Sequence, residues 1–293
     1  MSLVIKNISK SFGDKKVVDN LSFELNKPGV FGLLGTNGAG KTTTIRMILG
    51  IIKKDSGDIS WNGKSVTREN VNFGYLPEER GLYPKSKIYD QLMYFANLKG
   101  MSKIDADKSI RYWLDKLKVS EYINYTAEKL SKGNQQKIQF ITAVLHNPDL
   151  IVLDEPFSGL DPVNTEILSN IMKELVKNGK YIIMSSHQMS SVEEFCTDLV
   201  ILDRGKSILK GNLKEIKNSY KTSKVIVEVN DNIDDIIKDL KLSVLSKDDN
   251  VYVISADDNI RQKLFKRLCD RNIEKFEVVR PSLHEIFIDK VGE

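Results

Sequence analysis

The sequence contains very little cysteine. Only Cys196 and Cys269 occur among 293 residues, and they lie far apart in no metal-like spacing. Two such residues build neither a disulfide framework nor a cysteine-based zinc site. We therefore interpret both as free thiols in a reducing compartment.

Long hydrophobic runs are also missing. No apolar stretch approaches the roughly 20 residues that a membrane-spanning helix needs. The first residues, Met1 to Lys6, lack the basic region and apolar core of a signal peptide. The sequence predicts a cytoplasmic protein, and any action at a membrane would need a partner that spans it.

Neither sign of charge dominates. The chain has 44 basic and 40 acidic residues, a formal net charge of +4. This small excess argues against a dedicated nucleic-acid-binding protein, whose basic surface should dominate. The length suffices for one large domain and one small one.

The chain does contain a phosphate-binding loop. Residues 35–43 read GTNGAGKTT and fit the pattern G-x-x-x-x-G-K-[ST] at every fixed position. An apolar strand is predicted before the loop and a helix after it, as the motif requires. The glycines let backbone N–H groups point at phosphate oxygens. Lys41 should reach the β- and γ-phosphates, and the Thr42 hydroxyl should hold Mg²⁺.

Two carboxylates follow a second apolar strand, residues 150–153. In a parallel sheet the carboxyl ends of the strands face the ligand. Asp154 therefore suits holding the metal, and Glu155 suits polarising the attacking water. Such a pair is only moderately specific by itself, but it is strong beside a phosphate loop in the same chain.

Three further residues have two interpretations each. Phe12, predicted in a loop, either stacks on adenine or packs in the core. Glu78, after a strand that ends near Pro77, either reaches the metal or belongs to a solvated acidic turn. His187 ends the strand 181–186, and it either contacts the γ-phosphate or is structural.

Residues 86–145 are predicted to be mainly helical, with Trp113 in the core. A helix opens in the segment 130–137, with Ser131 as a plausible N-cap. Ser131, Gly133 and the free amides of that helix start form a second potential anion site. An ordinary capped helix is the alternative.

Residues 221–293 are predicted to form a separate domain with the element order βαββαβ, which is ferredoxin-like. This domain has no catalytic constellation. We interpret it as a docking, dimerisation or regulatory module.

Over residues 1 to about 215, these motifs together resemble the ATP-binding subunit of an ABC transporter. Residues 35–43 match the Walker A motif and 150–155 the Walker B motif. Residues 130–134, LSKGN, resemble the signature LSGGQ and depart from it at Lys132 and Asn134. Residues 158–161 look like the D-loop. Residues 281–287, PSLHEIF, resemble the C-terminal domain of bacterial export ATPases of the sodium-extrusion, antibiotic-resistance and peptide-export type.

The resemblance implies an α/β fold, a P-loop NTPase ABC ATPase core in residues 1–215 with an antiparallel β subdomain and a helical subdomain at about 86–145. A small α+β ferredoxin-like domain at 221–293 would follow. The resemblance also implies ATP and Mg²⁺ as cofactors and a head-to-tail dimer, either homodimer or heterodimer. An integral membrane permease would be the partner at the inner face of the cell membrane, and no nucleic acid is expected.

The resemblance further implies roles for single residues. Lys41, Glu155 and His187, the switch histidine, would be catalytic, and Thr42, Glu78 and Asp154 would hold the metal. Glu78 stands where the family usually has glutamine. The nucleotide-binding residues would be Phe12, Val18, Asn37, Gly38, Ala39, Gly40, Lys41, Thr42, Thr43, Ser131, Gly133, Asn134 and Asp161. Each ATP would lie between one chain's Walker A loop and the Ser131 region of the other chain.

Two other functions compete with transport. A soluble ABC ATPase acting on ribosomes or DNA usually has two cassettes or a long coiled coil, whereas this chain has one cassette and no long heptad run. A purely regulatory nucleotide-binding module would not need the water-polarising Glu155. Despite the departures at Glu78 and Asn134, hydrolysis is expected to persist with altered coupling.

Overall fold

The computed structural model describes residues 1–67, 71–79, 81–220 and 223–292. The chain divides into two compact units, Met1–Lys210 and Gly211–Glu293. This division falls a few residues before the predicted end of the first domain at 215. The predicted start of the second domain, at 221 and 222, lies outside the described residues.

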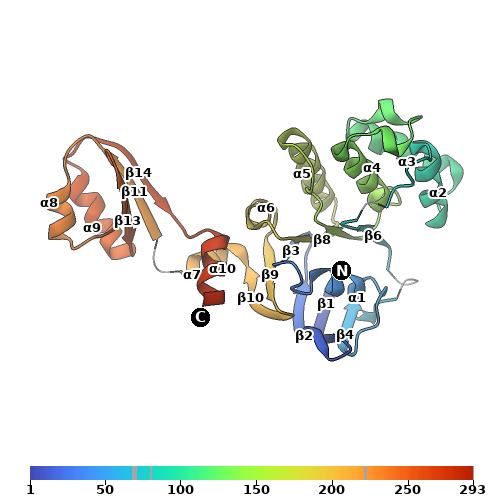
Figure 1. Cartoon of the computed structure of the whole chain (residues 1–293), viewed down its shortest axis with the longest axis horizontal. Coiled ribbons are helices and arrows are strands. Elements are labelled where there is room, and N and C mark those ends of the chain that lie inside the picture. Colours follow the sequence, from blue (N-terminus) through green and yellow to red (C-terminus); the bar gives the residue numbers. More distant parts are fainter. Residues whose placement is uncertain (68–70, 80, 221–222, 293) are drawn as a thin grey trace. The chain divides into compact units, whose positions relative to one another are not determined.

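A six-stranded sheet organises the first unit (Figure 1). Its order is β10 (Lys206–Asn212), β9 (Asp198–Asp203), β3 (Gly29–Gly35), β8 (Tyr181–Ser186), β7 (Leu150–Asp154) and β6 (Phe73–Leu76). β6, β7, β8, β3 and β9 pair in parallel. β7 and β8 are buried along their whole length, as expected for strands covered on both faces. Parallel pairing brings the carboxyl ends of these strands to one edge.

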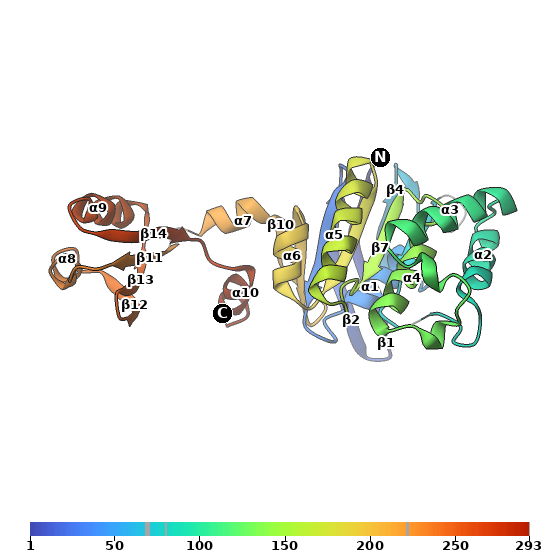
Figure 2. The ribbon, with the colours of Figure 1, turned by 90° about the horizontal axis from the view of Figure 1, so that it is seen from above.

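Helices cover both faces of this sheet. Figures 1 and 2 show α5 (Pro162–Lys177) and α6 (Met189–Phe195) on the face opposite α1 (Lys41–Ile48). α6 approaches β3 closely because Gly32 has no side chain. A Cβ there would lie 2.7 Å from Cγ1 of Val192.

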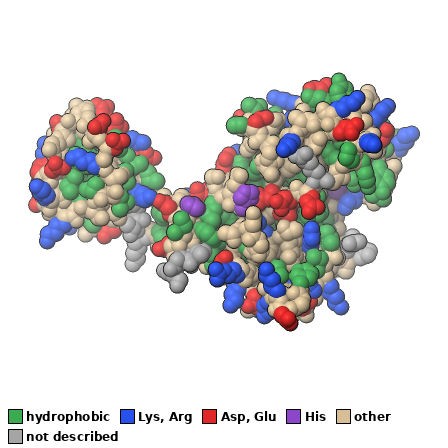
Figure 3. Space-filling model, viewed as in Figure 1, with side chains coloured by type: hydrophobic (Ala, Val, Ile, Leu, Met, Phe, Trp, Pro, Cys, Tyr) green, Lys and Arg blue, Asp and Glu red, His purple; other side chains and the backbone are tan. Residues whose placement is uncertain are grey.

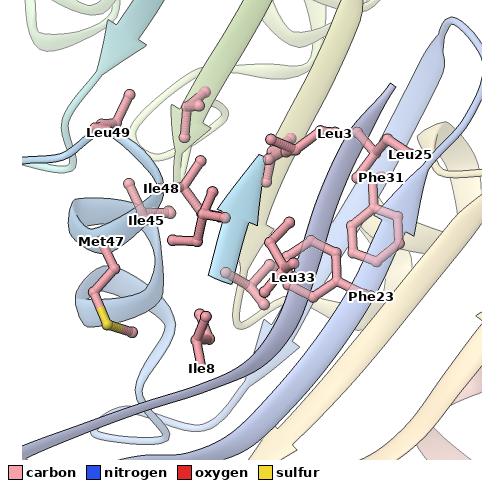
Figure 4. Close-up of a cluster of buried hydrophobic side chains, with 14 of the residues drawn as sticks. Leu3, Ile8, Phe23, Leu25, Phe31, Leu33, Ile45, Met47, Ile48 and Leu49 are labelled. Atoms are coloured by element: carbon pink, nitrogen blue, oxygen red, sulfur yellow. The ribbon is translucent and has the colours of Figure 1, made fainter. Parts of the chain in front are cut away.

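An antiparallel sheet in the order β2-β1-β4-β5 forms the predicted β subdomain. Its strands are β1 (Leu3–Phe12), β2 (Lys15–Leu25), β4 (Ser56–Trp61) and β5 (Lys64–Ser65). Apolar side chains from this sheet, from β3 and from α1 form one core (Figure 4). Within that core, the rings of Phe23 and Phe31 stack 4.7 Å apart. Phe12 is the last residue of β1, so its prediction as a loop residue was wrong.

Three helices make up the helical subdomain, α2 (Ile88–Leu98), α3 (Lys103–Lys116) and α4 (Lys132–Val144). Two short 3₁₀ turns, Ser120–Tyr122 and Ala127–Lys129, connect α3 to α4. The Trp113 ring packs edge-on against Phe140 of α4, 6.4 Å between centroids, as predicted for a core aromatic.

The second unit contains the predicted βαββαβ order. Its elements are β11 (Ser223–Val229), α8 (Asp234–Asp239), β12 (Ser243–Asp248), β13 (Val251–Ala256), α9 (Asp258–Leu268) and β14 (Ile273–Val279). The antiparallel sheet runs β12-β13-β11-β14, the ferredoxin-like arrangement. α7 (Leu213–Ser219) precedes this module and α10 (Leu283–Gly292) follows it. In the described ranges of either unit, no helix is both long and apolar enough to span a membrane.

Candidate active site

The phosphate loop joins β3 to α1. Gly40 precedes α1 with φ 105°, and a Cβ there would lie 2.6 Å from the carbonyl oxygen of Val17. Only glycine fits this position without strain. In the described ranges, the N-cap residue Gly40 forms no side-chain cap bond at the start of α1, and backbone N–H groups at a helix start can bind an anion.

The side chain of Lys41 lies inside this loop. Its Nζ donates to the carbonyl oxygens of Gly35 at 2.7 Å and Thr36 at 3.2 Å, and the residue is 7% exposed. These bonds keep the cation among the loop amides that face a phosphate. Asn37 and Gly38 are exposed on the loop, and Thr43 follows in the first turn of α1.

Thr42 lies beside Asp154 at the end of β7. The Thr42 hydroxyl is 3.3 Å from Oδ2 of Asp154, and the Ser185 hydroxyl donates to Oδ1. A hydroxyl and a carboxylate oxygen at this distance fit Mg²⁺, a hard cation that prefers oxygen ligands. In the described part of the chain, no group of three or more His, Cys, Asp or Glu side chains could hold a metal ion. Mg²⁺ held by Thr42 and Asp154 would take its other ligands from phosphate and water oxygens.

Glu155 is held by the end of the neighbouring strand β8. Its Oε1 accepts from the backbone N–H of His187 at 2.8 Å and lies 2.7 Å from Nδ1 of the same residue. Its Oε2 lies 3.4 Å from the Ser186 hydroxyl. Glu155 is buried, whereas the His187 side chain is half exposed. Figure 3 shows acidic side chains gathered beside a histidine on the visible face of the first unit.

Glu78 is exposed and lies two residues past β6. Leu76 pairs with Leu153 of β7, so the chain reaches Glu78 just beyond the level of Asp154. Among the described residues, no hydrogen bond joins Glu78 to Thr42 or Asp154. The structure thus brings Glu78 to the sheet edge at which Asp154 lies.

Phe12 and Val18 belong to the β subdomain, and Val18 borders the phosphate loop at Gly40. The Phe12 side chain is 50% exposed, and Nζ of Lys10 lies 5.5 Å from its ring centroid. An exposed ring can stack on a nucleobase. Val18 is fully buried, and its Cγ2 would lie 3.3 Å from a Cβ at Gly40.

The predicted signature and D-loop residues form a second cluster. The Ser131 hydroxyl caps α4 and accepts from the Asn134 N–H at 3.3 Å. A Cβ at Gly133 would lie 3.6 Å from Cδ2 of Leu160 in the D-loop. Asp161 caps α5, and its bond from the Asn164 N–H lowers its pKa. In the described ranges, no hydrogen bond links this cluster to the phosphate loop.

The residues that support the site were missed by sequence reasoning. Gln136 and Gln139 of α4 bind carbonyls beside Glu155 and Glu78. Tyr75 of β6 lies near Asp154. Its pKa is raised mainly by burial and also by the negative charge of Asp154. Only Ser185 and Ser186 could have been found from the sequence, because their hydroxyls end a predicted strand beside the strand that leads to Asp154 and Glu155.

The chain matches two known families. Residues 18–158 match the family described as ABC transporter. Residues 211–291 match the C-terminal domain of DrrA1-3-like ATP-binding proteins. The chain therefore belongs to the ATP-binding proteins of ABC transporters, which bind ATP and hydrolyse it to power transport. Members of this family generally dimerise and work with membrane permeases.

Several individual proteins are similar to this one. An uncharacterized ABC transporter ATP-binding protein of Bacillus subtilis, YhaQ, is 49% identical over 99% of this chain and 98% of its own length. The linearmycin resistance ATP-binding protein LnrL of the same species is 34% identical over 73% of this chain and 70% of its own length. The Nod factor export ATP-binding protein I of Cupriavidus metallidurans is 32% identical over 74% of this chain and 73% of its own length. A solved ATP-binding subunit of an ABC transporter superposes with a TM-score of 0.69 at 30% identity, covering 75% of this chain and 93% of that one.

Proposed function

We propose that this chain binds Mg²⁺-ATP on its own phosphate loop, hydrolyses it within a head-to-tail dimer, and thereby drives export through a membrane permease. The observation that carries the proposal is the placement of Glu155. It is buried, held by His187 and Ser186, and lies at the same sheet edge as Thr42. A fixed carboxylate there is a base for water, which nucleotide binding alone does not need.

Each residue at this edge has a separate role in the proposed reaction. Lys41 and the loop amides bind the phosphates, and Thr42 with Asp154 holds the metal. Bound Mg²⁺ supplies positive charge against the phosphate oxygens. Glu155 accepts the proton of the attacking water, and His187 keeps the carboxylate in place.

Charge develops on the far side of the γ-phosphate during transfer, and a donor group placed there would stabilise it. The start of α4 offers such a group. Ser131 and Lys132 are exposed there, and in the described ranges no hydrogen bond joins this helix start to the chain's own phosphate loop. We infer that it completes the ATP site of a second copy or of a related subunit.

The proposed contact for the permease is a hydrophobic patch made of the exposed Tyr83, Tyr94 and Leu98 and the half-buried Phe95. Tyr83 is 53%, Tyr94 49% and Leu98 64% exposed. The rings pack on one another with centroids 5.7 to 6.5 Å apart. Exposed apolar patches of this kind mark interaction sites. Export is favoured by the name of the Nod factor export protein and is compatible with the resistance named for LnrL. The chain would then act at the inner face of the membrane.

The dimer can be tested with two substitutions. Glu155→Gln preserves the shape of the site but removes the base, so ATP should bind and remain intact. Light scattering should then find a dimer in Mg²⁺-ATP and a monomer in ADP. Adding Ser131→Arg places a bulky side chain where the second γ-phosphate must lie. The double variant should return to a monomer while each chain still binds one ATP. If it dimerises as well as the single variant, the α4 start does not complete the site.

A further inference from the structure

Two buried glutamines lie one helical turn apart on α4. Gln136 is 7% exposed and Gln139 is 2% exposed. Nε2 of Gln136 donates to the carbonyl oxygen of Pro156 at 3.1 Å. Nε2 of Gln139 donates to the carbonyl oxygens of Pro77 at 3.2 Å and Glu79 at 2.8 Å. Residues three apart on a helix share a face, so one face of α4 holds both loops.

Each of these carbonyls lies next to a carboxylate of the candidate active site. Pro156 directly follows Glu155, and the two carbonyls bound by Gln139 lie on either side of Glu78. The helical subdomain is therefore hydrogen-bonded to both acidic loops at the sheet edge. Ser131, which the proposed function assigns to the second ATP, caps the same helix.

Gln139 is bonded at one end only. Its Oε1 is buried and has no hydrogen-bond partner in the part of the chain that is described. Gln91 of α2 is equally buried, 2% exposed, but both its amide oxygen and its amide nitrogen form hydrogen bonds. It donates to the Ser86 carbonyl and accepts from the Tyr83 N–H, each at 3.1 Å. An unsatisfied buried acceptor lowers stability, so Gln139 should stabilise the fold less than Gln91 does.

We propose that Gln139, assisted by Gln136, is a positioning residue for ATP hydrolysis. Its amide fixes the loop that carries Glu78 relative to α4, and Gln136 does the same for the segment after Glu155. A movement of the α4 start then moves both acidic loops with it. This inference rests on the proposed roles of Glu78 and Ser131, while ATP hydrolysis itself is a property of the family.

The test compares Gln139→Met with Gln91→Met in the full chain. Methionine has nearly the same size as glutamine but removes both polar ends. Gln139→Met should lower kcat for ATP about tenfold, because a small misplacement of catalytic groups is costly. Its KM for ATP should stay within about twofold, since the phosphate loop is untouched. Its half-saturating Mg²⁺ concentration should rise. Gln91→Met should leave all three quantities unchanged.

Stability provides the second readout. Gln139→Met should lower the melting temperature less than Gln91→Met does. The change at Gln139 removes the unsatisfied Oε1 as well as the hydrogen bonds of Nε2, and the first effect offsets part of the second. The proposal is overturned if the two variants have the same kcat, or if Gln139→Met is the less stable one or fails to fold. Failure of the proposed function would look different, because Lys41→Ala would then hydrolyse ATP at the wild-type rate.

Discussion

Glu155 adopts a backbone conformation that is costly for a glutamate. Its φ is 50°, in the left-handed region that glycine prefers. Non-glycine residues persist there only where the surroundings impose the conformation, and such residues concentrate at functional sites. The N–H of Glu155 donates to the Ser185 carbonyl at 3.2 Å, and the N–H of His187 donates to the Glu155 carboxylate at 2.8 Å. With this backbone conformation, Oε1 of Glu155 lies within hydrogen-bond distance of both the N–H and Nδ1 of His187.

His146 gives the stability of the protein a pH dependence. Its Nε2 lies 2.8 Å from the Phe73 carbonyl, and burial lowers its pKa to about 4. Between pH 6.5 and 4 the folded state therefore binds fewer protons than the unfolded state, so stability falls as the pH falls through this window. The loss attributable to His146 is at most about 3 kcal/mol.

Urea unfolding of wild type and His146→Gln at pH 7 and pH 4.5 measures this contribution. Lowering the pH from 7 to 4.5 should reduce the free energy of unfolding more for the wild type than for His146→Gln, because glutamine does not titrate. Parallel behaviour of both proteins would show that His146 is protonated as easily when folded as when unfolded.

The sequence was sufficient to place residues whose position depends on local structure. Lys41, Thr42 and Asp154 lie where a loop and a strand end predict, because sterics and parallel pairing leave few alternatives, and their roles stay predictions. Gln139 was not predictable, because its acceptors lie 60 and 62 residues away and helical periodicity marks it only as buried. The contact of His187 with Glu155 likewise spans 32 residues.

At the scale of elements, the β9–β10 hairpin supports the phosphate loop. The N–H of Gly205 donates to the Ala39 carbonyl at 3.1 Å, and its carbonyl accepts from the Asp19 N–H at 2.8 Å. A Cβ at Gly205 would lie 2.5 Å from the Val17 carbonyl oxygen, the atom that also crowds Gly40. Three segments distant in sequence therefore meet at one backbone oxygen.

We expect Gly205→Ala to weaken ATP binding, because the added methyl must displace Val17 and with it the loop. Gly179→Ala is the matched control, since both glycines have φ 82° but a Cβ at Gly179 meets nothing within 4 Å. Both variants should lose about 1 kcal/mol of stability from the left-handed backbone. Only Gly205→Ala should raise the Kd for ATP in calorimetric titration. Equal affinities would mean that the loop tolerates the shift.

In the described ranges, each of the two compact units has a hydrophobic core of its own. One lies around α1, and the other packs α8 and α9 on the C-terminal sheet through residues such as Val227 and Leu264. Each compact unit with its own core can unfold by itself. The nucleotide residues named above all lie before Lys210, within the first unit.

Scanning calorimetry should therefore show two transitions. Mg²⁺-ATP at about 100 times its Kd stabilises the unit that binds it by about 2.7 kcal/mol. The midpoint temperature of one transition should therefore rise by several degrees, while that of the other stays the same. The measurement is best made with Glu155→Gln, in which the nucleotide persists. A single transition that shifts as a whole would indicate that the two units unfold cooperatively.

The two cysteines divide between these units. Cys196 is buried beneath Gly32 in the first unit, where burial raises its thiol pKa, and Cys269 is exposed in the second. Thiolates react and neutral thiols do not. A maleimide dye will thus label the folded wild-type chain once, on the C-terminal unit, without any engineered site. A second dye, added as the first unit opens, will report that opening in real time from the same molecule.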